Sequence, residues 1–169
     1  MESQTTTLPL KQLVFRAELR SPLPERKLSL GAFHFCPSAT SALPLSSALL
    51  SRFGVPGTLK MFGRLLTPSR EFICVAAGGR LATYAVVNVG FCRRYAVEPG
   101  AILLCNGWTD PQYRGRGLME GMLARAINHL IARGSRIFYM DTRENNTAMR
   151  IVIERFGFGP PVSTIEPYD

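Results

Sequence analysis

The chain has 169 residues, of which 46% are hydrophobic, so it can bury one core and we expect a single domain over residues 1–169. The 20 basic residues outnumber the 12 acidic residues and give a net charge of +8, which favours an anionic ligand or partner. The sequence contains neither a basic tract typical of a nucleic-acid arm nor an apolar run long enough to cross a bilayer, so we expect no nucleic-acid partner and no membrane association.

The first third of the chain, residues 1–60, is interrupted by prolines and has the least regular pattern. Alternating apolar residues predict strands at 13–19 and 27–35. Helical spacing predicts short helices at 45–53 and 58–66.

The middle of the chain has the pattern of an antiparallel meander. Residues 71–77 and 80–91 are rich in strand-forming residues, and the Gly78-Gly79 pair between them predicts a two-residue hairpin turn. Residues 101–109 predict a third strand.

The last third of the chain predicts alternating helices and strands. Apolar residues recur every three or four positions over 118–133, which predicts an amphipathic helix. A strand at 135–142, a helix at 146–156 that begins with Asn146 as its N-cap, and a strand at 158–165 follow. The fold class is therefore α+β, with a mixed, mostly antiparallel sheet and flanking helices.

The segment QYRGRGLMEG, which starts at Gln112, has the composition of a phosphate-binding loop between a strand and a helix. Glycines let the backbone approach a ligand, the helix N-terminus offers unpaired N–H groups, and guanidinium groups suit phosphate oxygens. We expect a pyrophosphate to bind along Arg114, Gly115, Arg116, Gly117 and Leu118.

Two other kinds of phosphate loop fit the sequence less well. A P-loop requires Lys and Ser or Thr directly after its last glycine, but Leu118 and Met119 follow Gly117. A dinucleotide fingerprint requires a third glycine at the position of Glu120. Asp141, at the end of the next predicted strand, could still bind a ribose, so a dinucleotide-binding module remains an alternative.

Two motifs in the correct order resemble the GCN5-related N-acetyltransferase (GNAT) family. QYRGRG at 112–117 fits the family signature Q/R-x-x-G-x-G/A, and the segment from Asn146 to Phe158 resembles N-x-[AS] followed by E-[KR]-x-G-F. The resemblance covers residues 101–160 well and 71–91 in outline, and it leaves 1–60 unmatched.

The resemblance implies the acyl-CoA N-acyltransferase fold, with a central sheet that is splayed in the middle. It implies acetyl-CoA or another acyl-CoA as co-substrate, without a metal, and a primary amine as acceptor. Residues 71–160 would bind the cofactor and 1–60 would form the acceptor side. Gln112 belongs to the signature, Gly107, Trp108 or Thr109 would polarise the thioester carbonyl through a backbone N–H group, and Asn146 would contact the cofactor arm or cap its helix.

The sequence departs from the family at the usual catalytic positions. Many members carry a Tyr at the position of Ile153 as general acid, and histone-modifying members carry a Glu at the position of Ala101. A histone-like acceptor is therefore disfavoured, and we expect a small amine, an amino sugar or an amino-acid derivative. The catalytic residues stay unassigned, with Tyr139, Tyr113, Cys105, Asn106 and Glu98 as candidates.

Two further expectations concern the environment and activity of the protein. The four cysteines are widely spaced, with no histidine at zinc-ligand spacing, so we expect no metal site and a reduced, cytoplasmic compartment. The N-terminus lacks the pattern of a signal peptide. A monomer or a homodimer is expected, and a non-catalytic acyl-CoA sensor is the alternative to an enzyme.

Overall fold

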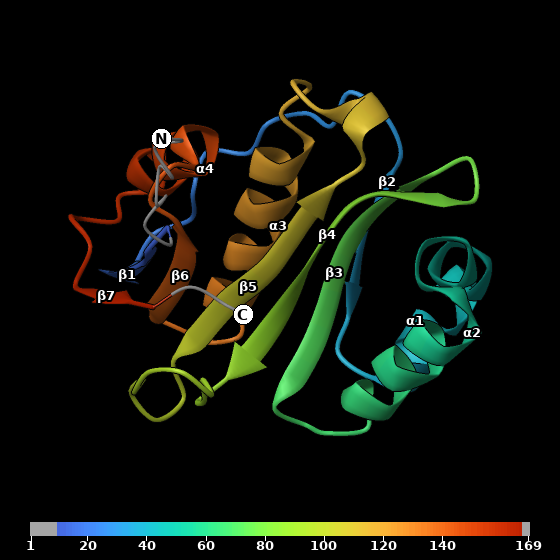
Figure 1. Cartoon of the computed structure of the whole chain (residues 1–169), viewed down its shortest axis with the longest axis horizontal. Coiled ribbons are helices and arrows are strands. Elements are labelled where there is room, and N and C mark those ends of the chain that lie inside the picture. The colour runs from blue at the N-terminus through green and yellow to red at the C-terminus, as the bar shows by residue number, and fades with distance from the viewer. Residues whose placement is uncertain (1–9, 167–169) are drawn as a thin grey trace, which may run out of the picture.

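The computed structural model describes residues 10–166, which form one seven-stranded sheet with helices on both faces (Figure 1). The strand order is β2-β3-β4-β5-β6-β1-β7. The elements in chain order are β1 (Gln12–Glu18), β2 (Ala32–Cys36), α1 (Ala39–Ala42), η1 (Leu43–Leu45), α2 (Ser46–Leu65), β3 (Arg70–Ala77), β4 (Arg80–Val89), β5 (Ile102–Thr109), η2 (Pro111–Tyr113), α3 (Leu118–Ala132), β6 (Ile137–Arg143), α4 (Thr147–Arg155) and β7 (Ser163–Ile165).

The predicted α+β class with a mixed, mostly antiparallel sheet is confirmed. Within residues 10–166, β5 and β6 are the parallel pair and the other neighbouring strands pair antiparallel. A doubly wound dinucleotide-binding sheet would instead be mostly parallel. The topology therefore disagrees with the dinucleotide alternative.

Each face of the sheet has its own apolar core. On one face, α3 and α4 cover the larger core, which includes Ile73, Leu104, Met122 and Phe138. On the other face, α1 and α2 cover β2, β3 and β4, and the loop of residues 90–100 covers β1, β5 and β6. We call these the α3 face and the α2 face.

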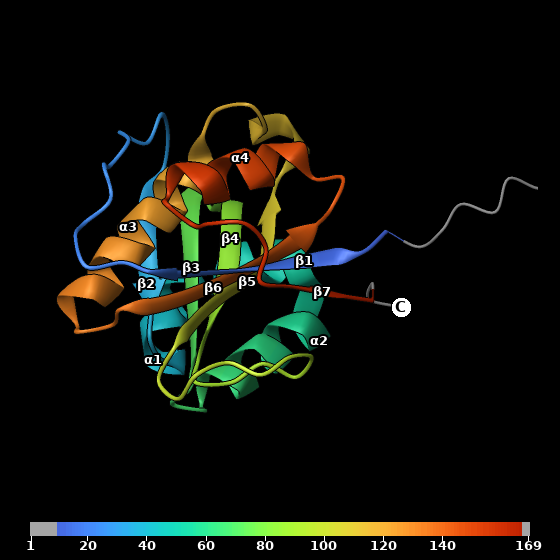
Figure 2. The same cartoon turned by 90° about the vertical axis from the view of Figure 1, so that its left-hand side faces the viewer.

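Several predicted elements differ from the observed ones. Residues 27–31 are not strand, because the segment after β1 runs beside α3 and then turns at Gly31, whose φ is +73° (Figure 2). The two predicted helices at 45–53 and 58–66 are two arms of α2, which meet at the non-helical Gly54. The predicted last strand is restricted to β7, and α1 was not predicted.

The N-terminal part of the chain divides between the two faces. The α2 helix lies on the α2 face, but the Leu23 backbone exchanges hydrogen bonds with Asn128 of α3, and Leu28 packs on the α3 side of the sheet. Residues 10–60 therefore contribute to both faces of the sheet, the assignment of residues 1–60 to the acceptor side stays a prediction, and the first nine of them lie outside the described range.

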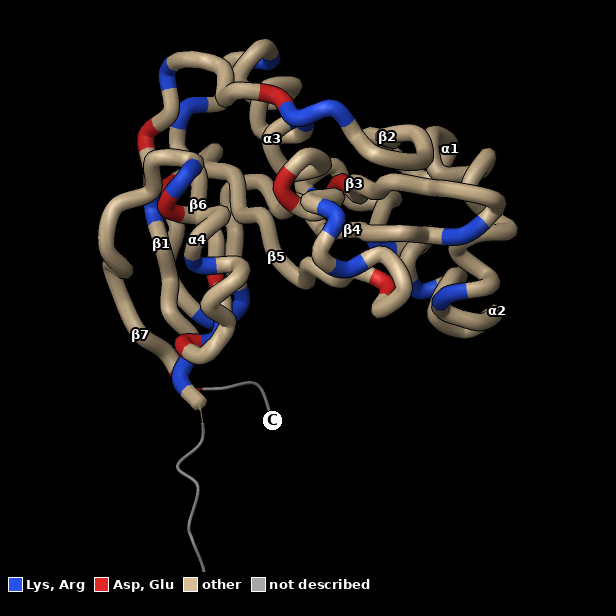
Figure 3. Tube along the Cα trace, turned by 90° about the horizontal axis from the view of Figure 1, so that it is seen from above, with Lys and Arg blue, Asp and Glu red and all other residues tan. Residues whose placement is uncertain are grey.

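Lys, Arg, Asp and Glu residues occur along much of the described trace (Figure 3). None of the helices within residues 10–166 is long and apolar enough to span a membrane. The four cysteines are free thiols, and the same part of the chain holds no cluster of three potential metal ligands.

Candidate functional site

The sheet opens between its two parallel strands, and this opening creates the main cavity. Three residues of β5, Ile102–Leu104, pair with Phe138–Met140 of β6. Beyond them β5 stays paired with β4 alone, so the edge of its second half is free. A cavity of about 750 Å³ lies there on the α3 face, which is within the size range of ligand pockets.

A β-bulge bends β5 where the cavity begins. Cys105 pairs with Val86 and Trp108 pairs with Tyr84, so β5 has one more residue than β4 between these pairs. Asn106 is the single non-glycine residue with positive φ in the described chain, at +53°. Gly107, one of the three residues expected to polarise the thioester carbonyl, lies within this bulge, and that role stays a prediction.

Gly107 also allows close packing against α3. A Cβ atom at this position would lie 3.1 Å from Cε of Met119, which is tighter than ordinary van der Waals contact. The missing side chain thus lets the start of α3 lie directly against the bulge.

The Gly-rich loop lies at the cavity, where Arg114, Gly115 and Gly117 are part of the lining. The Asp110 carboxylate accepts a hydrogen bond from the Gln112 amide at 3.0 Å and fixes the start of the loop. Gly115 and Gly117 have φ values of +74° and +70°. Gly117 is the N-cap of α3 and offers no side chain, so the first amides of α3 have no side-chain cap and are suited to an anion.

Arginines from three parts of the chain surround this loop. Arg26, Arg114 and Arg155 line the cavity. The Glu120 carboxylate lies 3.0 Å from the Arg26 guanidinium and 3.3 Å from that of Arg155, so one acid holds two arginines beside the loop.

Sequence reasoning missed Arg26 and Arg155. Arg26 lies in the segment that matched nothing, and its contact with α3 is a tertiary feature. Arg155 shares one face of α4 with Met149 and Val152, both of which also line the cavity. Helical spacing from Asn146 would therefore have identified it.

Most of the predicted cofactor-binding residues come together at this cavity. Two of them, Gln112 and Arg116, are exposed and lie outside its lining. The Arg116 guanidinium instead lies 5.8 Å from the Tyr113 ring centroid. The predicted residues that line the cavity are Gly107, Trp108, Thr109, Arg114, Gly115, Gly117, Leu118 and Asn146.

Asn146 caps α4 and also borders the cavity. Its Oδ1 accepts a hydrogen bond from the Met149 amide at 3.2 Å, and its Nδ2 donates to the Thr142 hydroxyl at 3.0 Å. The predicted N-cap is confirmed, while contact with a cofactor stays a prediction.

A second, smaller cavity of about 230 Å³ lies on the α2 face. Cys105 lines both cavities, so the second cavity reaches the point where β5 leaves β6. Its lining residues are Arg64, Arg70, Val86, Asn88, Phe91, Cys92, Arg93, Arg94, Leu103, Cys105 and Asn106.

Cys105 is a neutral thiol at physiological pH. Burial, together with the charges of Asp141 and Cys92, raises the pKa of Cys105 to about 12. The Asn88 side chain donates to its sulfur at 3.7 Å. A thiol in this state is a poor base and a poor nucleophile.

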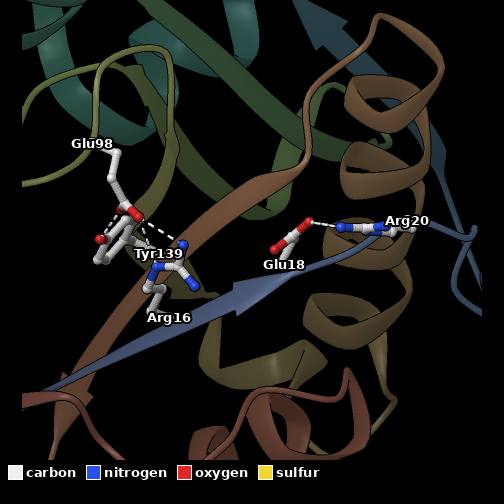
Figure 4. Close-up of polar contacts among 5 residues, drawn as sticks. All are labelled: Arg16, Glu18, Arg20, Glu98 and Tyr139. Atoms are coloured by element: carbon white, nitrogen blue, oxygen red, sulfur yellow. Dashed lines mark hydrogen bonds and ion pairs between the residues drawn. The ribbon is translucent and has the colours of Figure 1, made fainter.

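Glu98 and Tyr139 bind each other and lie outside the lining of both cavities. Arg16 Nη2 lies 2.7 Å from the same Glu98 carboxylate (Figure 4). The hydrogen bonds from Arg16 and Tyr139 lower the pKa of Glu98 to about 2, whereas burial and the bond to Glu98 raise the pKa of Tyr139. Neither residue is placed to exchange a proton with a ligand in the cavities.

The two positions at which family members carry a general acid and a general base hold buried apolar residues in this chain. Ile153 is 1% exposed in the core of the α3 face, and Ala101 is 2% exposed beneath the loop of residues 90–100. Among the candidates, Cys105 and Asn106 line the smaller cavity and Tyr113 lines the larger one.

Comparisons with known proteins agree with this geometry. The model of the acetyltransferase (GNAT) family matches residues 46–158. A comparison with curated proteins gave no match.

Solved structures with the same fold include acetyltransferases in complex with CoA derivatives. An acetyltransferase of the GNAT family from Novosphingobium aromaticivorans is 19% identical, with a TM-score of 0.58 over 97% of this chain and 67% of that one. AAC(6')-Iy, an aminoglycoside N-acetyltransferase, in complex with a CoA–acetylneamine bisubstrate analogue is 18% identical, with a TM-score of 0.59 over 82% and 99%. An acetyltransferase with acetyl-CoA from Clostridium acetobutylicum is 18% identical, with a TM-score of 0.55 over 81% and 95%.

Proposed function

Because this chain belongs to the GNAT acetyltransferase family, we propose that it transfers an acetyl or other acyl group from acyl-CoA to the primary amine of a small molecule. The observation that supports this most directly is the separation of β5 from β6, which opens a cavity that ends at the amides of the Gly loop. An elongated ligand with a phosphate at one end and amide groups along its arm suits such a cavity.

The residues of the cavity have complementary roles in this proposal. The loop of residues 114–118 and the N-terminus of α3 hold the pyrophosphate, with Arg26 and Arg155 nearby. The free edge of β5 pairs with the amides of the pantetheine arm in the manner of an added strand. A backbone N–H group within 107–109 polarises the thioester carbonyl.

Acyl transfer then requires an amine on the α2 face, next to Cys105. The amine nitrogen attacks the carbonyl carbon, the C–N bond forms, and the C–S bond breaks with the electron pair leaving on the thiolate sulfur. A thiol with an ordinary pKa of about 8.5 can leave without protein acid catalysis, which suits the apolar Ile153. The amine proton passes to solvent.

A non-catalytic acyl-CoA sensor is the second candidate. It is favoured by the burial of Ile153 and Ala101 and by the mutual pairing of Glu98 and Tyr139.

The proposal is tested by binding and by turnover. In a thermal-shift titration, acetyl-CoA and CoA should raise the melting temperature and NAD should not. Absence of a shift with every CoA species would contradict the proposal. Thiol release with a panel of primary amines then separates the two candidates, because a sensor would bind acetyl-CoA and release no thiol with any of them.

A further inference from the structure

The smaller cavity concentrates positive charge on the side of the sheet opposite α3. Arg64 extends from the last turn of α2, Arg70 begins β3, and Arg93 belongs to the loop after β4. Arg64 and Arg70 flank the short connection between α2 and β3, and the fold brings Arg93, from the loop after β4, to the same cavity. Arg94 also lines the cavity and donates a hydrogen bond to the Glu166 carbonyl.

No acid balances this charge within the cavity. None of the lining residues in the described chain is Asp or Glu, and Arg64, Arg70 and Arg93 form no ion pair within residues 10–166. Arginines elsewhere do have acidic partners: Arg16 pairs with Glu98, and Arg133 lies 2.7 Å from Glu71. Arg64, Arg70 and Arg93 differ from these two arginines in having no acidic partner within the described residues.

The guanidinium groups are close enough to affect one another. Burial and then the charges of Arg93 and Arg64 lower the pKa of Arg70. Arginine nevertheless stays protonated at physiological pH, so the repulsion persists. An anion bound among the three groups would relieve it, and guanidinium geometry suits a carboxylate or a phosphate.

The smaller cavity lies next to the bulge of β5, where the acceptor amine is proposed to react, and it also contains the arginines. Cys105 and Asn106, at the bulge where β5 leaves β6, form one wall, and Arg64, Arg70 and Arg93 form others. A volume of about 230 Å³ limits the occupant to a small molecule. A compact amine could thus place its nitrogen at the bulge and its other end among the arginines.

We propose that the acceptor is a small amine that carries its own anionic group, a carboxylate or a phosphate, which binds to Arg64, Arg70 and Arg93. The proposal rests on the acyltransferase function proposed above. It narrows the acceptor to amino acids, their derivatives and amino sugar phosphates. Polycationic amines such as aminoglycosides are disfavoured by repulsion.

The same positive charge would favour the reactive form of the acceptor. Nearby cations lower the pKa of an ammonium group, so a larger fraction of the acceptor is the free amine at neutral pH. The described lining supplies no carboxylate base, and electrostatic depression of the ammonium pKa provides an alternative to one.

Matched amine pairs test the proposal in a thiol-release assay with acetyl-CoA. The two members of each pair share the amine-bearing skeleton, and only the first carries an anion: glycine with glycinamide, β-alanine with β-alaninamide, and glucosamine 6-phosphate with glucosamine. Neamine represents the polycations. We expect at least about tenfold higher kcat/KM for the anionic member of an accepted pair, and the best pair distinguishes a carboxylate from a phosphate.

Variants of single arginines test whether the preference for anionic acceptors arises in the smaller cavity. Arg93→Gln should raise KM for the anionic acceptor about tenfold and lower the ratio of kcat/KM between the anionic and the neutral member of the pair by a similar factor. Arg80→Gln is the matched control, because Arg80 is exposed at the β3–β4 hairpin and lies outside both cavities. Arg64→Gln and Arg70→Gln should resemble Arg93→Gln, with circular dichroism as the check on folding.

The outcomes separate this inference from the proposed function. Turnover with equal preference for both members of every pair, or a preference for neamine, would overturn the inference and leave the acyltransferase function intact. If no amine supports turnover, the CoA-bound protein is titrated with the anionic members in a calorimeter, and this measurement shows whether the anion site exists. Binding that Arg93→Gln weakens supports the anion site, and absence of binding overturns it.

Discussion

Tyr139 of β6 donates its hydroxyl hydrogen bond to the Glu98 carboxylate in the loop before β5, and Arg16 of β1 binds the same carboxylate (Figure 4). This arrangement joins three segments at the start of β5, whereas the Gly loop follows the other end of that strand. Glu98 and Tyr139, two of the sequence-based catalytic candidates, therefore bind each other and connect β1 and β6 to the loop before β5.

Replacing Glu98 with Gln should lower stability with little effect on turnover. The folded-state pKa of Glu98 is lowered to about 2, first by Arg16 and then by Tyr139. The carboxylate therefore stabilises the fold fully above its unfolded pKa of about 4.3, and this contribution is lost as the pH falls towards about 2. The melting temperature difference between wild type and Glu98→Gln should be largest at about pH 7 and smaller at about pH 3.

The activity of the same variant tests the structural assignment. With acetyl-CoA and an accepted amine, kcat should stay within about threefold of wild type, since general acid–base residues contribute about 10²–10⁴. A loss of that larger size in a folded Glu98→Gln protein would restore Glu98 as a catalytic residue.

Cys105 should not form an acyl-enzyme, although it borders both cavities. Its pKa of about 12 leaves almost no thiolate at neutral pH, and thiolate is the nucleophilic form. Intact-mass measurement after incubation with acetyl-CoA in the absence of an amine should show unmodified protein. An acetyl adduct that disappears in Cys105→Ser would contradict direct transfer to the amine.

The Gly117→Asp variant should bind CoA more than about tenfold more weakly, because it places a carboxylate at the N-terminus of α3, where the pyrophosphate is proposed to lie. Gly134→Asp is the matched control. Its φ of +98° imposes comparable backbone strain on an Asp side chain, but it lies at the opposite end of α3. Equal CoA affinity of the two variants, measured by calorimetry, would show that the loop does not hold the pyrophosphate.

The sequence was sufficient for local features and insufficient for contacts between distant segments. The Gly117 loop, the bulge at Gly107 and the Asn146 cap each follow from short-range backbone requirements, and all three are observed. Residues 27–31 alternate like a strand, but packing along α3 overrides that pattern. The arginine cavity depends on the approach of Arg93 to Arg64 and Arg70 in the folded sheet, and so no local pattern indicates it.

Arg26 tests whether the N-terminal part of the chain contributes to cofactor binding. A Cβ atom on Gly117 would lie 3.4 Å from an Arg26 guanidinium nitrogen, so the side chain crosses directly beside the loop. Arg26→Gln should weaken CoA binding by roughly three- to tenfold and reduce the salt dependence of the affinity, as expected for a lost phosphate contact.

Two comparisons isolate the effect of Arg26 on the phosphates. Binding of pantetheine, which lacks the phosphates, should be unchanged in Arg26→Gln. Arg20→Gln is the control for a nearby surface charge, since Arg20 is exposed and pairs with Glu18. Equal weakening for CoA and pantetheine would indicate an indirect effect through the Arg26–Glu120 ion pair.

Asn146 has two possible roles, which two substitutions can separate. Asn146→Ala removes the acceptor of the Met149 amide and should lower the free energy of unfolding by about 0.5–2 kcal/mol. Asn146→Asp keeps the cap, because Asp is an equally good N-cap residue, and should unfold near the wild-type denaturant concentration. It also removes the Nδ2 donor to Thr142 and adds a negative charge at the edge of the larger cavity.

CoA affinity of the two Asn146 variants then decides whether the side chain also contacts the ligand. If Asn146 serves as a cap alone, Asn146→Asp should bind CoA within about twofold of wild type. If its amide also donates to the cofactor arm, the affinity should fall by roughly tenfold in Asn146→Asp at unchanged stability. We expect the second result, because Asn146 lines the cavity between Thr142 and Met149.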